Sequence, residues 1–148
     1  RTVFGDNFAA YTAQVSPTVN LEPVRIWTDP ALPFSNGEAI TVTLSAYVVN
    51  NGNVATTRST IVRFYEGHPD QGGVLIGEQS VPPLEGCASG TTVTVTWPDV
   101  LPGDYTISAV IDPADGVAES DESDNVRMTR VLIATSRVWL PLAMKTTP

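Results

Sequence analysis

The chain has 148 residues, of which 42% are hydrophobic and 16% are charged, and its formal net charge is -8. A chain of this length forms one domain with at most a short appendage, and neither nucleic acid nor an anionic membrane is expected as a partner, because both require clustered positive charge. Cys87 is the single cysteine, which excludes an intrachain disulfide, and no apolar run approaches the roughly 18 residues of a membrane-spanning helix, which argues against membrane insertion.

The two ends of the chain lack the pattern of its centre. Residues 1–18 show no clean period and are expected to be an N-terminal extension or linker. Residues 19–134 are expected to form the domain, and residues 135–148 a separate C-terminal tail. Because the chain starts at Arg1 without Met or a signal peptide, we expect a mature form or an excised fragment.

Between these ends, seven short segments have the pattern of β-strands. The first covers residues 21–27, where Pro23 favours a sheet edge or a bulge. The second covers residues 39–49, and from residue 41 to residue 48 its apolar residues alternate with Thr, Ser and Tyr. The others are expected over residues 59–66, 74–81, 91–97, 105–111 and 126–134. Seven short strands separated by turn signals are typical of an all-β fold, an immunoglobulin-like antiparallel β-sandwich.

The same alternation selects the candidate core. We expect the core to contain Trp27, Val42, Leu44, Val48, Val62, Phe64, Val95, Trp97, Tyr105, Ile107 and Ile111. Tyr105 follows a Pro-Gly turn and has two interpretations. It either forms a tyrosine corner, in which its hydroxyl binds the backbone of the turn, or it is a core tyrosine behind a tight turn.

A strongly acidic loop separates the last two expected strands. Residues 112–125 read DPADGVAESDESDN and contain no basic residue. A loop this acidic must bind a cation, accept backbone N–H groups, or face water. Its six carboxylates are the candidate calcium ligands, because calcium takes six to eight oxygen ligands: Asp112, Asp115, Glu119, Asp121, Glu122 and Asp124.

A structural interpretation competes with calcium. The spacing does not fit an EF-hand, since placing Gly116 at the sixth position puts Ile111 where an Asp is required. Asp112 precedes Pro113, so its backbone is expected to be extended, with its carboxylate accepting N–H groups two or three residues later. Asp112, Glu122 and Asn125 are then loop caps, and the remaining acids face water. We therefore expect no cofactor, with calcium as the alternative.

Catalytic chemistry has little support in the sequence. A serine or cysteine nucleophile needs a base, and the single histidine, His68, lies in a polar turn. Cys87 has no basic residue or second thiol nearby in sequence that would activate it. A glycosidase needs two carboxylates across a cleft, whereas the acids here are concentrated in one loop. A small hydrolase remains the least favoured function.

Several segments, taken in order, resemble one family. They are Val-Val-Asn-Asn-Gly at residues 48–52, Val-Arg-Phe-Tyr-Glu-Gly at 62–67, Gly-Glu-Gln-Ser-Val-Pro-Pro-Leu at 77–84, Val-Thr-Val-Thr-Trp at 93–97, Pro-Gly-Asp-Tyr-Thr-Ile at 102–107 and the acidic stretch at 111–125. The set resembles the bacterial cell-adhesion-related domain, CARDB. The family pattern usually ends in Asn-Asn, where this chain has Asp124 and Asn125. The resemblance implies a seven-stranded extracellular module without catalytic activity or an agreed ligand.

The expected function follows from this resemblance. We expect a non-catalytic adhesion, spacer or protein-contact module of a larger exported bacterial protein, located outside the cell or on its surface. Its expected partners are neighbouring domains of the parent protein, surface proteins or polysaccharide. The alternative is a calcium- or carbohydrate-binding accessory module. Carbohydrate binding requires an exposed aromatic face, for which the candidates are Trp27, Tyr47, Tyr65 and Trp139.

Overall fold

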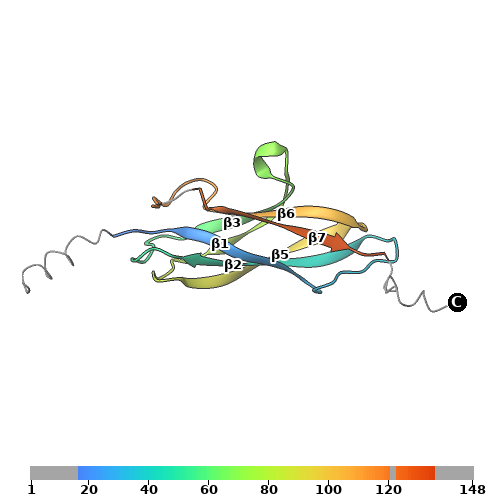
Figure 1. Ribbon diagram of the computed structural model, residues 1–148, viewed down its shortest axis with the longest axis horizontal. Helices are drawn as coiled ribbons and strands as arrows, with labels where there is room; N and C mark the ends of the chain where they lie inside the picture. The colour runs from blue at the N-terminus through green and yellow to red at the C-terminus, as the bar shows by residue number, and fades with distance from the viewer. Residues whose placement is uncertain (1–16, 121–122, 136–148) are drawn as a thin grey trace, which may run out of the picture.

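Seven strands form two antiparallel sheets that pack face to face (Figure 1). The computed structural model describes residues 17–120 and 123–135. The strands are β1 (Leu21–Asp29), β2 (Ile40–Asn50), β3 (Thr60–Glu66), β4 (Val74–Val81), β5 (Ser89–Val100), β6 (Gly103–Ile111) and β7 (Val126–Ile133). One sheet has the order β1-β2-β5 and the other β4-β3-β6-β7. The predicted all-β sandwich is confirmed.

The helical content of the described chain is minimal. A single 3-10 turn, Pro69–Gln71, lies between β3 and β4. No helix among the described residues is long and apolar enough to cross a membrane.

The inward faces of both sheets form one hydrophobic core. In β2, Val42, Leu44, Ala46 and Val48 are fully buried, as the alternation predicts. From the opposite sheet, the largest fully buried side chain is that of Phe64. Every other residue of the predicted core except Trp27 and Tyr105 is also buried: Val62, Val95, Trp97, Ile107 and Ile111.

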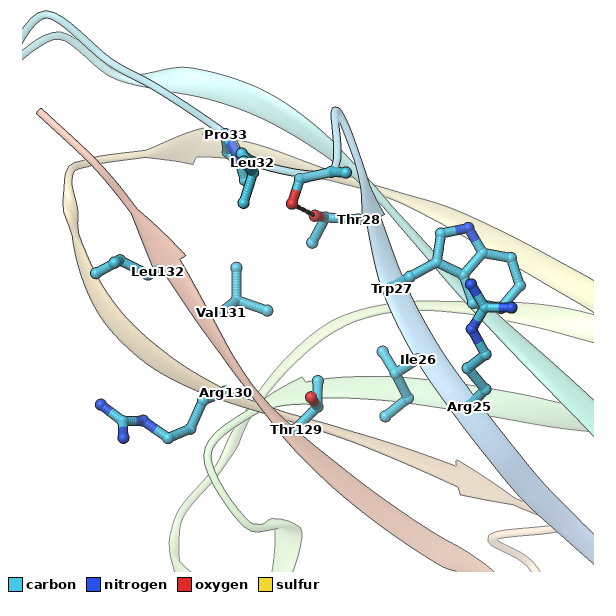
Figure 2. A pocket seen from close by; sticks show the side chains of 11 residues that line it. Arg25, Ile26, Trp27, Thr28, Leu32, Pro33, Thr129, Arg130, Val131 and Leu132 are labelled. Carbon is cyan, nitrogen blue, oxygen red and sulfur yellow. Dashed lines mark hydrogen bonds between the residues drawn. The ribbon is translucent and has the colours of Figure 1, made fainter. Parts of the chain in front are cut away.

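The prediction that Trp27 belongs to the core is wrong. The register of β1 against β2 shifts between Pro23 and Arg25, so the alternation of the strand changes phase at this bulge. Beyond the bulge, Ile26 packs against the core while Arg25 and Trp27 lie on the outer face. Figure 2 shows Ile26 on the side of β1 that faces Val131, whereas the indole of Trp27 lies on the other side. The Arg25 guanidinium lies 4.6 Å from the indole centroid, a cation–π contact.

Tyr105 forms a tyrosine corner. Its hydroxyl donates a 2.6 Å hydrogen bond to the carbonyl of Leu101, four residues upstream in the turn between β5 and β6. Its ring is partly buried and packs edge-on against Trp97, with 5.1 Å between the ring centroids. Tyr105 therefore pins the turn as a tyrosine corner, and it covers the edge of the core rather than being buried in it.

The described chain enters and leaves the sandwich at opposite ends of its long axis (Figure 1). β1 begins at the end where residue 17 lies, and β7 ends at the opposite end near residue 135. The strands run along this axis, so β1 and β7 point in the same direction although they belong to different sheets. We call these two ends the N-terminal and C-terminal poles.

Candidate functional site

The carboxylate of Asp112 is buried at the start of the acidic loop. Its Oδ1 accepts hydrogen bonds from the N–H of Gly116 and the hydroxyl of Thr60, each at 3.0 Å. Its Oδ2 accepts the N–H of Val117 at 2.9 Å. The residue is only 6% exposed, and its own N–H donates to the carbonyl of Ile61 at 2.9 Å. Asp112 thus closes the loop on itself and attaches it to β3.

The expectation of an extended backbone at Asp112 is wrong. Its φ is 55°, in the left-handed region, even though Pro113 follows. Aspartate adopts this region more readily than most residues, because its short side chain can hydrogen-bond locally. The turn brings the carboxylate to N–H groups four and five residues later, on Gly116 and Val117, rather than two or three.

Glu119 and Asp124 do not face water as the structural interpretation expects. Glu119 accepts the backbone N–H of Leu21 at 2.9 Å with Oε1 and the side-chain amide of Asn125 at 3.1 Å with Oε2. Asp124 accepts the side-chain amide of Asn20 at 3.0 Å. The loop is therefore hydrogen-bonded to the segment that leads into β1, far away in sequence.

The remaining predicted loop residues divide into three groups. Asp115 is exposed and also has a positive φ of 56°. Asn125 is 7% exposed, and its carbonyl accepts the N–H of Ile111 at 2.9 Å. Asp121 and Glu122 lie outside the described residues, so the expected cap at Glu122 stays a prediction.

The described residues do not present a ready metal centre. Nowhere in residues 17–120 and 123–135 do three or more His, Cys, Asp or Glu side chains gather as a metal site would require. Two side-chain oxygens near the loop, Oδ1 of Asn20 and Oδ1 of Asp124, are buried and have no hydrogen-bond donor among the described residues.

Asn50 also belongs to this site, although in the sequence it stands out only as part of the Val-Val-Asn-Asn-Gly segment at residues 48–52. It is fully buried, and its Oδ1 accepts the N–H groups of Asn20 at 3.1 Å and Gly52 at 2.9 Å. A Cβ on Gly52 would lie 2.2 Å from the carbonyl oxygen of Thr18, so only glycine permits this approach. The Asn-Asn-Gly sequence is a local signal for Asn50. No local pattern indicates that its side chain binds the backbone of Asn20, 30 positions earlier in the chain.

His68 and Cys87 occupy positions that suit structural roles. The Nδ1 atom of His68 accepts the N–H of Asp70 at 3.0 Å and caps the 3-10 turn. Cys87 is exposed in the turn before β5, and its backbone N–H donates to the carbonyl of Gly52 at 2.7 Å.

A groove of about 430 Å³ opens between β1 and β7 (Figure 2). Its lining includes Ile26, Thr28, Thr129 and Val131, together with the largely exposed Leu32 and Leu132. Two arginines, Arg25 and Arg130, also line it, but none of its described lining residues is a carboxylate or a histidine. The groove therefore lacks the acid and base groups that hydrolysis requires.

Comparisons with known proteins bear on the fold and the family. A CARDB domain from Pyrococcus furiosus, solved in complex with di-metal ions, is 23% identical, with a TM-score of 0.62 over 82% of this chain and 98% of that one. A domain of a candidate cell surface protein from Methanosarcina acetivorans is 26% identical, with a TM-score of 0.61 over 80% and 95% of the two chains. A protein from Geobacter metallireducens is 29% identical, with a TM-score of 0.56 over 76% and 93%.

No curated protein matches the chain in sequence. The CARDB family model matches residues 24–129, from the bulge of β1 to the middle of β7. This range includes the tyrosine corner and the whole acidic loop, and it covers more than half of the chain. The chain therefore belongs to the CARDB family, a type of non-catalytic module.

Proposed function

We propose that this domain is a spacer and protein-contact module of a larger exported protein. Family membership and the likeness to a domain of a candidate cell surface protein fit an extracellular module. The observation that supports the spacer role is the placement of the poles, because a neighbour on each side would be held apart by the full length of the sandwich (Figure 1).

Spin labels at the two poles test this geometry in solution. With Cys87 replaced by serine, the pair Pro17→Cys and Thr135→Cys should give a long and narrow distance distribution. The matched pair Pro17→Cys and Asn51→Cys should give a short one, because Asn51 and Asn53 pair with the segment that follows residue 17. Short distances for both pairs would remove the spacer proposal.

Antibody labelling of intact producing cells tests the location. We expect staining without permeabilisation, since an adhesion or contact module must be reachable from outside. Staining that requires permeabilised cells would contradict the proposed extracellular role.

Carbohydrate contact is a second candidate, supported by the outer face of the β1-β2-β5 sheet. Tyr47 is 36% exposed and pairs with Arg25 on one side and Thr92 on the other. Trp27 lies one row further along, beside Ser45. The exposed Asp99 lies near the end of β5, and the middle of this face is lined by uncharged side chains of β2 and β5: Thr41, Thr43, Ser45, Tyr47, Thr92, Thr94 and Thr96. Aromatic rings among hydroxyl groups suit a neutral polysaccharide better than a charged partner.

Pull-down on insoluble cellulose and chitin tests this second candidate. We expect binding that is lost in Tyr47→Ala and in Trp27→Ala, while Tyr65→Ala on the other sheet has no effect. If all three variants bound the polysaccharide equally well, a different surface of the protein would be responsible for the binding. Trp139, the fourth aromatic candidate, lies outside the described residues.

For the acidic loop we propose a structural role rather than a calcium site. Both oxygens of Asp112 and both oxygens of Glu119 already accept hydrogen bonds from protein donors. A cation at these two carboxylates would have to replace the protein donors that they already bind. The alternative of calcium binding is tested by the measurement that closes the Discussion.

A further inference from the structure

The segment before β1 is hydrogen-bonded to its own sheet through the loop that follows β2. The carbonyl of Thr18 accepts the N–H groups of Asn53 at 2.9 Å and Val54 at 3.1 Å, and its N–H donates to the side chain of Asn53 at 2.8 Å. The carbonyl of Asn20 accepts the N–H of Asn51 at 2.7 Å. Because the N–H of Asn20 also donates to Asn50, most backbone polar groups of residues 18–20 are hydrogen-bonded on this side.

The same segment is hydrogen-bonded to the other sheet through the acidic loop. That loop connects β6 to β7, which both belong to the four-stranded sheet. Its Ser120 N–H donates to the carbonyl of Val19 at 2.8 Å, in addition to the contacts of Glu119 and Asp124 described above. We call this set the N-terminal clasp: Val19, Asn20, Leu21, Glu119, Ser120 and Asp124.

The C-terminal pole has a corresponding connection between the sheets. Immediately after β7, Ala134 forms a parallel bridge with Phe34, in the turn region that follows β1. The N–H of Ala134 donates to Pro33 at 3.1 Å, and its carbonyl accepts the N–H of Ser35 at 2.8 Å. At each pole, therefore, the terminal segment of one sheet is hydrogen-bonded to a loop of the other.

Tension between the poles would load these strands in shear. Pulling residue 17 and residue 135 apart drags β1 along β2 and β7 along β6, because all four strands follow the long axis (Figure 1). Hydrogen bonds of antiparallel pairs are perpendicular to the strands, so this motion strains many of them at once rather than one after another. Separation of the first strands then requires that the clasp and several ladder bonds fail together.

We propose that the domain is built to resist axial tension, and that the acidic loop couples the incoming chain to both sheets. This inference rests on the proposed spacer role and deepens it: the module would transmit force between its neighbours without unfolding. It also assigns a purpose to the acidic stretch, since its carboxylates accept N–H and amide groups from the very segment that force would pull away.

Single-molecule force spectroscopy on the full chain tests the inference. Handles are attached through cysteines in a Cys87→Ser background, either at residues 17 and 135 or at residues 17 and 51. The first pair loads the strands in shear, and the second opens β1 from β2 at the N-terminal pole, beginning at Leu21 and Asn50. At equal loading rate, we expect a several-fold higher unfolding force for the axial pair. An axial force equal to or below that of the second pair would overturn the inference.

A clasp variant tests the part assigned to the acidic loop. In Glu119→Ala with Asp124→Ala, unfolding at a fixed axial load should become about tenfold faster, which corresponds to about 1.4 kcal/mol. The control is Glu78→Gln, which removes the exposed ion pair with Arg63 between β3 and β4, outside the path of the force. Equal rates in the clasp variant and the control would remove the loop from the mechanism.

The outcomes separate this inference from the proposed function. Low axial resistance in a protein that is displayed on intact cells would remove the mechanical inference alone. High axial resistance in a protein that is not displayed would remove the extracellular role and leave the mechanical property standing.

Discussion

Replacing Trp97 with alanine is expected to lower the free energy of unfolding by about 3–5 kcal/mol, the usual loss for a large aromatic core side chain. Trp97 is 5% exposed and lies opposite Val42 in the register of β5 against β2. Its removal leaves a cavity and also deletes the edge-to-face contact with Tyr105. Urea unfolding followed by far-UV circular dichroism measures the loss.

Trp27→Ala is the matched control for this prediction. The indole of Trp27 lies on the outer face of β1, where its described ring contact is with the Arg25 guanidinium. A cation–π contact at such a site contributes about 0.5–1 kcal/mol, so a loss of this order is expected. Equal losses at the two tryptophans, or a loss near zero at Trp97, would contradict the core that the structure describes.

Replacing Asp112 with alanine is expected to cost about 3 kcal/mol or more, because hydrogen bonds to a charged acceptor contribute roughly 1.5–3 kcal/mol each and three are lost. The N–H groups of Gly116 and Val117 lose their acceptor, and so does the hydroxyl of Thr60. Alanine is also strained at the positive φ of this position. Chemical denaturation again measures the change.

Two asparagine variants separate the causes of that loss. Asp112→Asn keeps one acceptor oxygen and tolerates the positive φ, so we expect a smaller loss of about 1–2 kcal/mol. Asp115→Asn changes an exposed residue with nearly the same φ, 56°, and should change stability by less than about 0.5 kcal/mol. If Asp112→Ala behaved like Asp115→Asn, the carboxylate of Asp112 would have no structural role.

The fold could be predicted from the sequence because its signals are local. Strict alternation from Val42 to Val48 places successive side chains on opposite faces of the strand. Because a one-residue slip against the neighbouring strand would turn the apolar side chains to the wrong face, the alternation strongly specifies the register. The turn residues between the strands limited each element to within a few residues of its observed bounds. Family-specific segments in the expected order then indicated the domain type.

The site could be predicted only in part, because its contacts join distant segments. After the bulge at Pro23, the residues of β1 that face the core alternate in the opposite order. The proline predicts an irregularity in the strand, but it does not predict which side chains face the core beyond it. Glu119 contacts Leu21, 98 positions earlier in the chain, and no local pattern in the acidic loop indicates this partner. The high density of carboxylates in the loop suggested a bound cation. In the structure, the carboxylates of Asp112, Glu119 and Asp124 instead accept hydrogen bonds from N–H, amide and hydroxyl groups, most of them on residues that the loop sequence does not indicate.

Thermal unfolding with and without millimolar calcium tests the central claim, that the acidic loop is held by protein donors, most directly. A ligand that binds only the native state raises its melting temperature by mass action. We expect the melting temperature to be the same in calcium and in chelator, because the carboxylates of Asp112 and Glu119 are already hydrogen-bonded. A melting temperature that is higher in calcium than in chelator, with the difference lost in Asp124→Asn, would contradict this account and would make the loop a cation site.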